Sequence, residues 1–148
     1  MEHIIKLDTF GPNLSLIFQT NGLTLFHINI RSIRKDFSAL KFYLAPSSTV
    51  FDLICVSETF LHIDEPFCLD VPDYSFIFIS WQERGGGVGI YVRDGIGCRG
   101  WGPVAVAGAE VLSAVLDFLI LSRQIRLVVV YRKPSSTIQN FLHDFGTL

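Results

Sequence analysis

The sequence predicts a mixed α/β fold in which two β-sheets pack as a sandwich and helices flank them. A strand-like segment, an amphipathic helix and a second strand-like segment follow one another between residues 23 and 57. Further strand-like segments come in pairs that short turns could join as hairpins. Hydrophobic residues make up 49% of the 148 residues, which excludes a disordered chain and suffices for the core of one domain.

The region that begins at residue 23 has the pattern of a strand, a helix and a strand. Within Leu23–Ile30 every second position from Phe26 onward is apolar, which is the period of a strand with one buried face. Apolar residues then recur at helical spacing from Ser32, a residue type suited to the N-cap, to Leu44. The almost unbroken apolar run Phe51–Ser57 is typical of a strand buried on both faces. Because a helix connects them, we expect the two strands to be parallel neighbours.

The rest of the chain contains four more strand candidates and a final helix. The strands are rich in β-branched and aromatic residues and are bounded by turn residues: Tyr74–Ser80, Val88–Val92, Val111–Phe118 and Arg126–Tyr131. The helix is Ile138–Phe145. Gly and Pro are frequent in Gly95–Gly108, where we expect a long loop. Residues 1–22 show no clear period, so we divide the chain into a poorly defined N-terminal segment, 1–22, and one domain, 23–148.

The mean hydropathy of +0.42 is high for a soluble protein and raises the question of a membrane span. The stretch Val111–Leu121 is interrupted by Ser113 and Asp117 and is short of the roughly 20 residues that a spanning helix needs. The first 18 residues lack the basic start and apolar block of a secretory signal. We therefore expect no membrane partner and an intracellular protein, nuclear or cytoplasmic. The three cysteines form no C-x-x-C pair, which argues against zinc.

The charge of the chain does not identify a partner. A net charge of −2 and an isoelectric point near 6.0 are unlike those of a strongly basic nucleic-acid-binding domain. Basic residues nevertheless cluster after two of the predicted strands, at Arg31, Arg34 and Lys35 and at Arg132 and Lys133. If both clusters share one face, they could hold phosphate groups.

Two predicted strands end at a single oxygen-bearing side chain, Asn29 in one and Glu58 in the other. Open α/β sheets place their ligands at the carboxyl ends of strands. Mg²⁺ prefers oxygen ligands and needs only one or two of them from the protein. The pair therefore suggests a magnesium site. A turn asparagine and a loop glutamate on the surface would give the same pattern.

The run Gly85–Gly89 and the residue Tyr131 each admit a structural interpretation. The glycine run matches neither the dinucleotide-binding nor the Walker A pattern, and it leads into a strand instead of a helix. We interpret it as a tight turn or a close backbone contact where only glycine fits. Tyr131 closes an apolar strand, so it belongs either to the core or to a site at the strand end.

Four segments, in this order, resemble the endonuclease domain of non-LTR (LINE-type) retrotransposons. They are Asn-x-Arg-Ser from Asn29, Ser-Glu-Thr-Phe-Leu around Glu58, Gly-Gly-Gly-Val from Gly85, and Tyr-Arg-x-Pro-Ser-Ser from Tyr131. That domain belongs to the endonuclease/exonuclease/phosphatase superfamily. Phosphoesterases acting on lipids or inositol phosphates are alternatives within the superfamily.

The resemblance implies a two-sheet sandwich flanked by helices and a Mg²⁺-dependent phosphodiesterase that nicks DNA. It implies that Glu58 binds the metal, that Asn29 organises the metal and the scissile phosphate, and that Tyr131 holds the phosphate during catalysis. Three arginines near these segments are candidate contacts to DNA phosphates, because a guanidinium group can bind an anion in bidentate fashion: Arg31, Arg84 and Arg132. Arg31 could equally be a solvated side chain of the first helical turn.

The family has two further motifs, Gly-Asp-x-Asn and Ser-Asp-His, and the second supplies the histidine for acid–base chemistry. Neither motif occurs in the 148 residues. We therefore expect this chain to be the N-terminal part of an endonuclease domain and to be inactive in isolation. The alternative is a non-catalytic remnant of a decayed element, with no selected activity.

Overall fold

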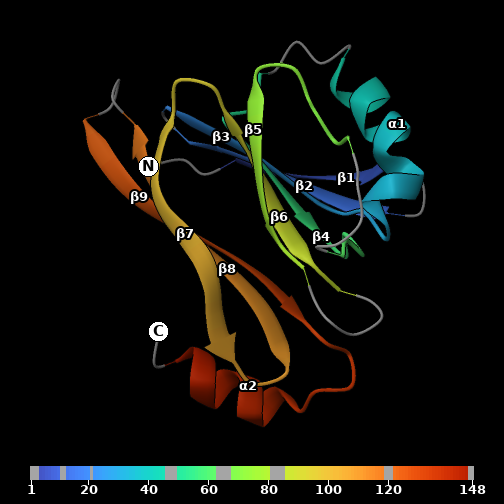
Figure 1. The fold of residues 1–148 in the computed structure, drawn as a ribbon, viewed down its shortest axis with the longest axis vertical. Coiled ribbons are helices and arrows are strands. Elements are labelled where there is room, and N and C mark those ends of the chain that lie inside the picture. The colour runs from blue at the N-terminus through green and yellow to red at the C-terminus, as the bar shows by residue number, and fades with distance from the viewer. Residues whose placement is uncertain are drawn as a thin grey trace.

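A computed structural model of the chain describes the following residues: 4–10, 13–20, 22–45, 50–62, 68–80, 86–118 and 122–146. Within these ranges the chain forms nine strands in two sheets and two helices (Figure 1). The predicted α/β class is therefore confirmed, with strands in the majority.

The first sheet has six strands in the order β1-β2-β3-β4-β6-β5. Their bounds are β1 Ile4–Phe10, β2 Asn13–Thr20, β3 Leu23–Asn29, β4 Leu53–Ser57, β5 Tyr74–Ile79 and β6 Val88–Arg93. Strands β3 and β4 are parallel, as the intervening helix α1 (Ile33–Leu44) leads one to expect. All other neighbours in this sheet are antiparallel.

The second sheet is an antiparallel meander of β7 (Gly97–Val106), β8 (Ala109–Phe118) and β9 (Arg123–Arg132). The prediction of a loop at Gly95–Gly108 is therefore wrong, because β7 occupies most of this segment. Pro and Gly are tolerated there because β7 is an outer strand that pairs only with β8. The register shifts between Cys98 and Gly100, as at a β-bulge.

Most of residues 1–22 also form strands. β1 and β2 make an antiparallel hairpin that extends the first sheet beside β3. Thr20 pairs with Leu23, so the chain reverses at Gly22, whose φ of 104° suits glycine.

Two apolar cores lie on the two faces of the first sheet. The alternation predicted for β3 is confirmed, since Phe26 and Ile28 are buried beneath α1 while Leu25 faces the second sheet. All five residues of β4 are buried, with alternate side chains entering one core or the other. The core between the sheets also contains Leu112 of β8 and Val129 of β9. The two sheets therefore pack face to face.

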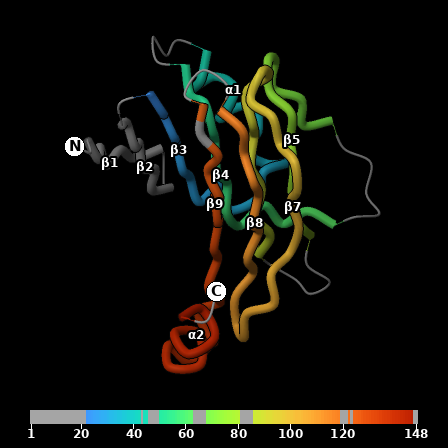
Figure 2. The backbone as a smooth tube through the Cα atoms, turned by 90° about the vertical axis from the view of Figure 1, so that its left-hand side faces the viewer, coloured from blue at the N-terminus to red at the C-terminus, as the bar shows by residue number. Residues whose placement is uncertain are grey.

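The helices occupy opposite ends of the molecule (Figure 2). α1 covers one face of the first sheet through buried residues such as Ile33 and Leu40. α2 (Ile138–Phe145) has no buried residue and lies against the end of the β7–β8 hairpin, where Phe141 packs. Neither helix in the described ranges is long and apolar enough to cross a bilayer.

Candidate functional site

Asn29 and Glu58 lie at the same edge of the first sheet, namely the one where the parallel strands β3 and β4 reach their carboxyl ends. The parallel register pairs Asn29 with Ser57, so Glu58 is the next residue beyond this pair. The chains stay together past the strands, since the Ile30 amide donates to the Ser57 carbonyl at 3.0 Å. The Ser32 amide donates to the Glu58 carbonyl at 2.8 Å. The two strand ends that were predicted to form one site are therefore neighbours.

The backbone turns sharply at Glu58, which directs its side chain toward the second sheet. Val56 faces the α1 core, so an undisturbed strand would carry Glu58 to the same side. Its φ of 55° breaks that alternation. The Glu58 carboxylate instead accepts a hydrogen bond from the hydroxyl of Tyr131 on β9.

Tyr131 lies at the boundary between the core and the site. Its ring packs against the core between the sheets and is half-buried, while its hydroxyl reaches Glu58. Burial raises the pKa of Tyr131, and the negative charges of Glu58 and Glu110 raise it further. The interpretation of Tyr131 as a purely apolar core residue is therefore excluded by its contact with Glu58.

Three buried side-chain oxygens in the described ranges have no hydrogen-bond partner: Asn29 Oδ1, Thr59 Oγ1 and Glu110 Oε1. Native proteins leave few such atoms, so each one calls for an explanation. Asn29 and Thr59 belong to the two segments that meet at this edge. With the carboxylate of Glu58 beside them, the available atoms are hard oxygens of the type that Mg²⁺ prefers.

The same two segments hold an unusual share of strained backbone. Six non-glycine residues in the described ranges have positive φ, and four of them are Arg31, Ser32, Glu58 and Phe60. Such conformations cost free energy and persist where the surrounding structure enforces them, often at functional sites. Here the strain coincides with the two segments that carry Asn29 and Glu58.

The glycine turn, meaning Gly86 and Gly87 directly before β6, holds the Glu58 segment in place from the other side. The Thr59 amide donates to the Gly87 carbonyl at 3.1 Å, and the Phe60 amide donates to the Gly86 carbonyl at 2.8 Å. Both glycines have φ near 90°, and a Cβ on Gly87 would overlap Thr59 Oγ1. Of the two interpretations of the glycine run, the close contact in which only glycine fits is therefore confirmed at Gly86 and Gly87.

Glu110 is a site residue that belongs to none of the sequence motifs. It lies on β8 directly opposite Tyr131, and only 2% of its surface is exposed. One carboxylate oxygen accepts a hydrogen bond from the Gly87 amide. Burial raises the pKa of Glu110, although the Gly87 amide and the positive charge of Lys133 oppose that rise. A carboxylate at the start of an apolar strand was the signal available in the sequence.

His27 lies behind the site, on the strand that leads to Asn29. Its Nε2 is 3.4 Å from the hydroxyl of Ser57 on the neighbouring strand. Burial lowers the pKa of His27, which favours the neutral ring. His27 is therefore a half-buried strand residue that supports the end of β4.

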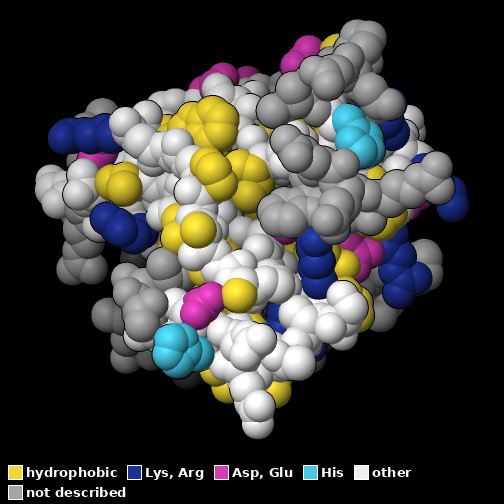
Figure 3. Space-filling model, turned by 60° about the horizontal axis from the view of Figure 1, so that its bottom comes forward, with side chains coloured by type: hydrophobic (Ala, Val, Ile, Leu, Met, Phe, Trp, Pro, Cys, Tyr) yellow, Lys and Arg dark blue, Asp and Glu magenta, His cyan; other side chains and the backbone are white. Residues whose placement is uncertain are grey.

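The predicted phosphate contacts differ in their positions. Arg31 is exposed and belongs to the strained segment itself. Arg132 instead turns back on its own loop, where its guanidinium donates to the Ser136 carbonyl at 2.8 Å. Arg84 lies outside the described residues. On the face of the molecule that Figure 3 shows, basic side chains are interspersed with acidic and apolar ones.

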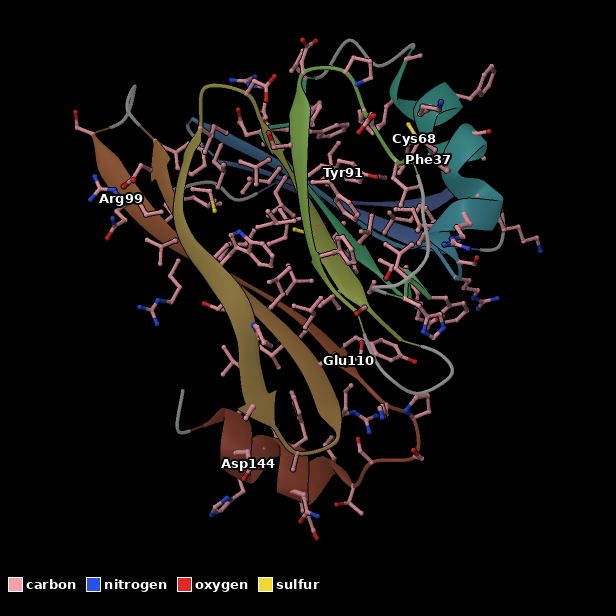
Figure 4. All side chains as sticks on the ribbon, viewed as in Figure 1. Phe37, Cys68, Tyr91, Arg99, Glu110 and Asp144 are labelled. Atoms are coloured by element: carbon pink, nitrogen blue, oxygen red, sulfur yellow. The ribbon has the colours of Figure 1, made fainter. Side chains whose placement is uncertain are left out.

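A groove of about 560 Å³ opens beside Glu110. Ile79 and the residues of the β7–β8 hairpin give it a mainly apolar lining, and Glu110 and Asp144 are its acidic members. Figure 4 shows Glu110 below the start of β6 and Asp144 further down on α2. The groove therefore adjoins the site without containing Glu58 or Asn29.

The described residues contain no cluster of three or more His, Cys, Asp or Glu side chains placed to hold a metal ion. Comparison of the chain with protein-family models, curated proteins and solved structures gave no match. The site is therefore defined by its geometry: a carboxylate, an amide oxygen and a phenol that three distant segments bring to one edge.

Proposed function

We propose that this chain is the N-terminal part of a Mg²⁺-dependent endonuclease domain of the non-LTR retrotransposon type, whose substrate is DNA. The observation that carries the proposal is the hydrogen bond between Tyr131 and Glu58. Both residues were assigned to one site by their sequence motifs alone. They come from different sheets, so nothing in the sequence required them to meet.

Asn29 and Glu58 are the residues that would hold the divalent ion. Their oxygens fit such an ion, because the Asn29 amide oxygen is buried without a partner and Glu58 offers a carboxylate. The bound ion would supply positive charge that stabilises the attacked phosphate and the leaving oxygen. A site with two protein ligands agrees with the habit of Mg²⁺ to retain several waters.

Tyr131 and the basic residues have roles that follow from their own chemistry. The Tyr131 hydroxyl, which donates to Glu58, can instead donate to an oxygen of a bound phosphate group. Arg31 is exposed beside Glu58 and can contact a phosphate in bidentate fashion. The 148 residues provide no counterpart of the histidine and aspartate of the Ser-Asp-His motif. In this proposal the present residues bind and orient the phosphate, while acid–base chemistry requires the absent motif.

The proposal is tested first through ion binding, which needs no catalysis. Mn²⁺ takes the same oxygen ligands as Mg²⁺, and its binding to the 148-residue chain can be followed by electron paramagnetic resonance. We expect Mg²⁺ to compete with Mn²⁺ and Glu58→Ala to abolish binding. Asp94→Asn is the matched control, because Asp94 is exposed in the turn beyond the opposite end of β6. Equal binding by wild type and Glu58→Ala would contradict the metal site and favour the non-catalytic alternative.

A further inference from the structure

We propose that Glu110 is a positioning residue for Glu58, acting through the glycine turn and through Tyr131. The inference rests on the proposed role of Glu58 as a metal ligand and adds a residue that the sequence motifs do not contain. Glu110 belongs to the second sheet and Glu58 follows a strand of the first. The proposed role is therefore to fix the position of the second sheet relative to the Glu58 segment at the site.

The first route runs through the backbone of the glycine turn. The Gly87 amide donates to Glu110 Oε2, and the Gly87 carbonyl accepts from the Thr59 amide at 3.1 Å. The Gly86 carbonyl accepts from the Phe60 amide in the same way, at 2.8 Å. The Gly86 carbonyl and the Gly87 amide belong to one peptide unit, which is therefore hydrogen-bonded to Phe60 on one side and to Glu110 on the other.

The second route runs through the side chain of Tyr131. Glu110 and Tyr131 are direct cross-strand partners, so their side chains lie on the same face of the second sheet. The hydroxyl of Tyr131 then donates to Glu58. A shift of Glu110 would therefore disturb both the backbone and the carboxylate of Glu58.

The cost of the arrangement indicates that it serves a purpose. Burying a carboxylate with an unpartnered oxygen is expensive, and Glu110 Oε1 has no partner. The turn is shaped to this side chain, because a Cβ on Gly86 would overlap Oε1. An apolar residue would fill the same space at lower cost, but it could not accept a hydrogen bond from Gly87.

Three variants of the 148-residue chain separate these contributions. Glu110→Gln keeps an oxygen that can accept from Gly87, whereas Glu110→Met keeps the volume and loses the acceptor. Leu112→Met is the matched control, because Leu112 is fully buried on the same face of β8, two residues further on. Mn²⁺ affinity and the NMR resonances of the Thr59 and Phe60 amides are measured for each. In wild type, a coupling across the hydrogen bond between the Gly87 nitrogen and the Glu110 carboxyl carbon is sought.

We expect the wild-type coupling to be present and Glu110→Met to shift both amide resonances. We expect Glu110→Met to weaken Mn²⁺ binding by about 10- to 100-fold, the usual cost of losing a residue that orients a metal ligand. Glu110→Gln should behave like wild type and Leu112→Met should change neither readout. Unchanged affinity and amides in Glu110→Met, or equal losses in Glu110→Gln and Glu110→Met, would overturn the inference.

Two other outcomes also test the inference. If Glu110→Met does not fold, the wild-type coupling decides, and its absence overturns the inference. If wild type binds no Mn²⁺, the proposed metal site fails independently of Glu110. The positioning role is then judged by the Thr59 and Phe60 amides alone, and unshifted amides in Glu110→Met overturn it.

Discussion

The hydroxyl of Tyr131 donates a hydrogen bond to the carboxylate of Glu58, although the two residues belong to different sheets. The contact closes the sandwich at the edge where β3 and β4 end. It also ties the Glu58 segment to the Tyr131 segment, two of the four segments on which the resemblance rests. The stability of the fold and the geometry of the site are therefore coupled through one pair of side chains.

This coupling predicts a measurable interaction energy. In a double-mutant cycle of Tyr131→Phe and Glu58→Ala, we expect a coupling of about 0.5–3 kcal/mol in the free energy of unfolding, because each change removes the same hydrogen bond. Urea unfolding of the four proteins measures it. Tyr91→Phe is the control, because the Tyr91 hydroxyl donates to the Leu69 carbonyl, away from Glu58. Its cycle with Glu58→Ala should be additive, and additivity of the Tyr131 cycle would show that the bond contributes nothing.

The glycine turn should not tolerate a side chain. Gly87→Ala would place a Cβ on Thr59 Oγ1 at a backbone φ of 90°, and the conformation alone costs about 1–2 kcal/mol in an L-residue. We expect thermal or urea unfolding to show at least this loss of stability. At Gly102 a Cβ would meet no atom within 4 Å, so Gly102→Ala should leave stability within about 0.5 kcal/mol. Similar losses in both variants would refute the close-packing explanation.

Glu110 should make stability depend on pH. Its pKa in the folded chain is raised above the ordinary value of 4.5, so the folded state holds the proton longer than the unfolded state does. The stability that this group contributes is present below pH 4.5 and is lost as the pH rises through the raised pKa. Glu110→Gln cannot titrate, so we expect its stability to gain on that of wild type as the pH rises from 4.5 to neutrality. Unfolding curves at several pH values check this, and a constant difference would contradict it.

Catalysis should require residues beyond those present here. We expect no Mg²⁺-dependent nicking of plasmid DNA by the 148-residue chain above background, because it has neither the Gly-Asp-x-Asn nor the Ser-Asp-His motif. A longer chain that includes both motifs should nick DNA, and Glu58→Ala in that chain should abolish the activity. Nicking by the short chain that depends on Glu58 would show that the motifs are dispensable. Activity of the longer chain that survives Glu58→Ala would remove Glu58 from the metal site.

Local patterns predicted the part of the fold in which each segment carries its own signal. The alternation in β3, the helical spacing of α1 and the apolar run of β4 agree, and together they place Asn29 and Glu58 at one edge. β7 was mistaken for a loop because its Gly and Pro content gives the wrong local signal. Its strand conformation comes from pairing with β8, which only the folded chain supplies.

The part of the site that the sequence could not predict depends on contacts between the sheets. In the sequence, Glu110 is only a charged residue near the start of a strand. In the fold, the strand register places it opposite Tyr131, and it accepts a hydrogen bond from the Gly87 amide of the glycine turn. The direction of the Glu58 side chain likewise follows from a positive φ that no local pattern specifies. Residue types and spacing therefore predicted which residues meet at this edge, and tertiary packing determined how they are held.

The division of the site between two sheets has a consequence for how the chain folds. β7, β8 and β9 are consecutive hairpins whose contacts are local in sequence, so their pairing closes short loops and is expected early. Glu58 and Tyr131 meet only after this meander has docked on the first sheet. Their hydrogen bond should be unformed in the transition state for folding, with a φ-value near zero. Substitutions in the site would then accelerate unfolding and leave the folding rate nearly unchanged. They would therefore shorten the lifetime of the native state.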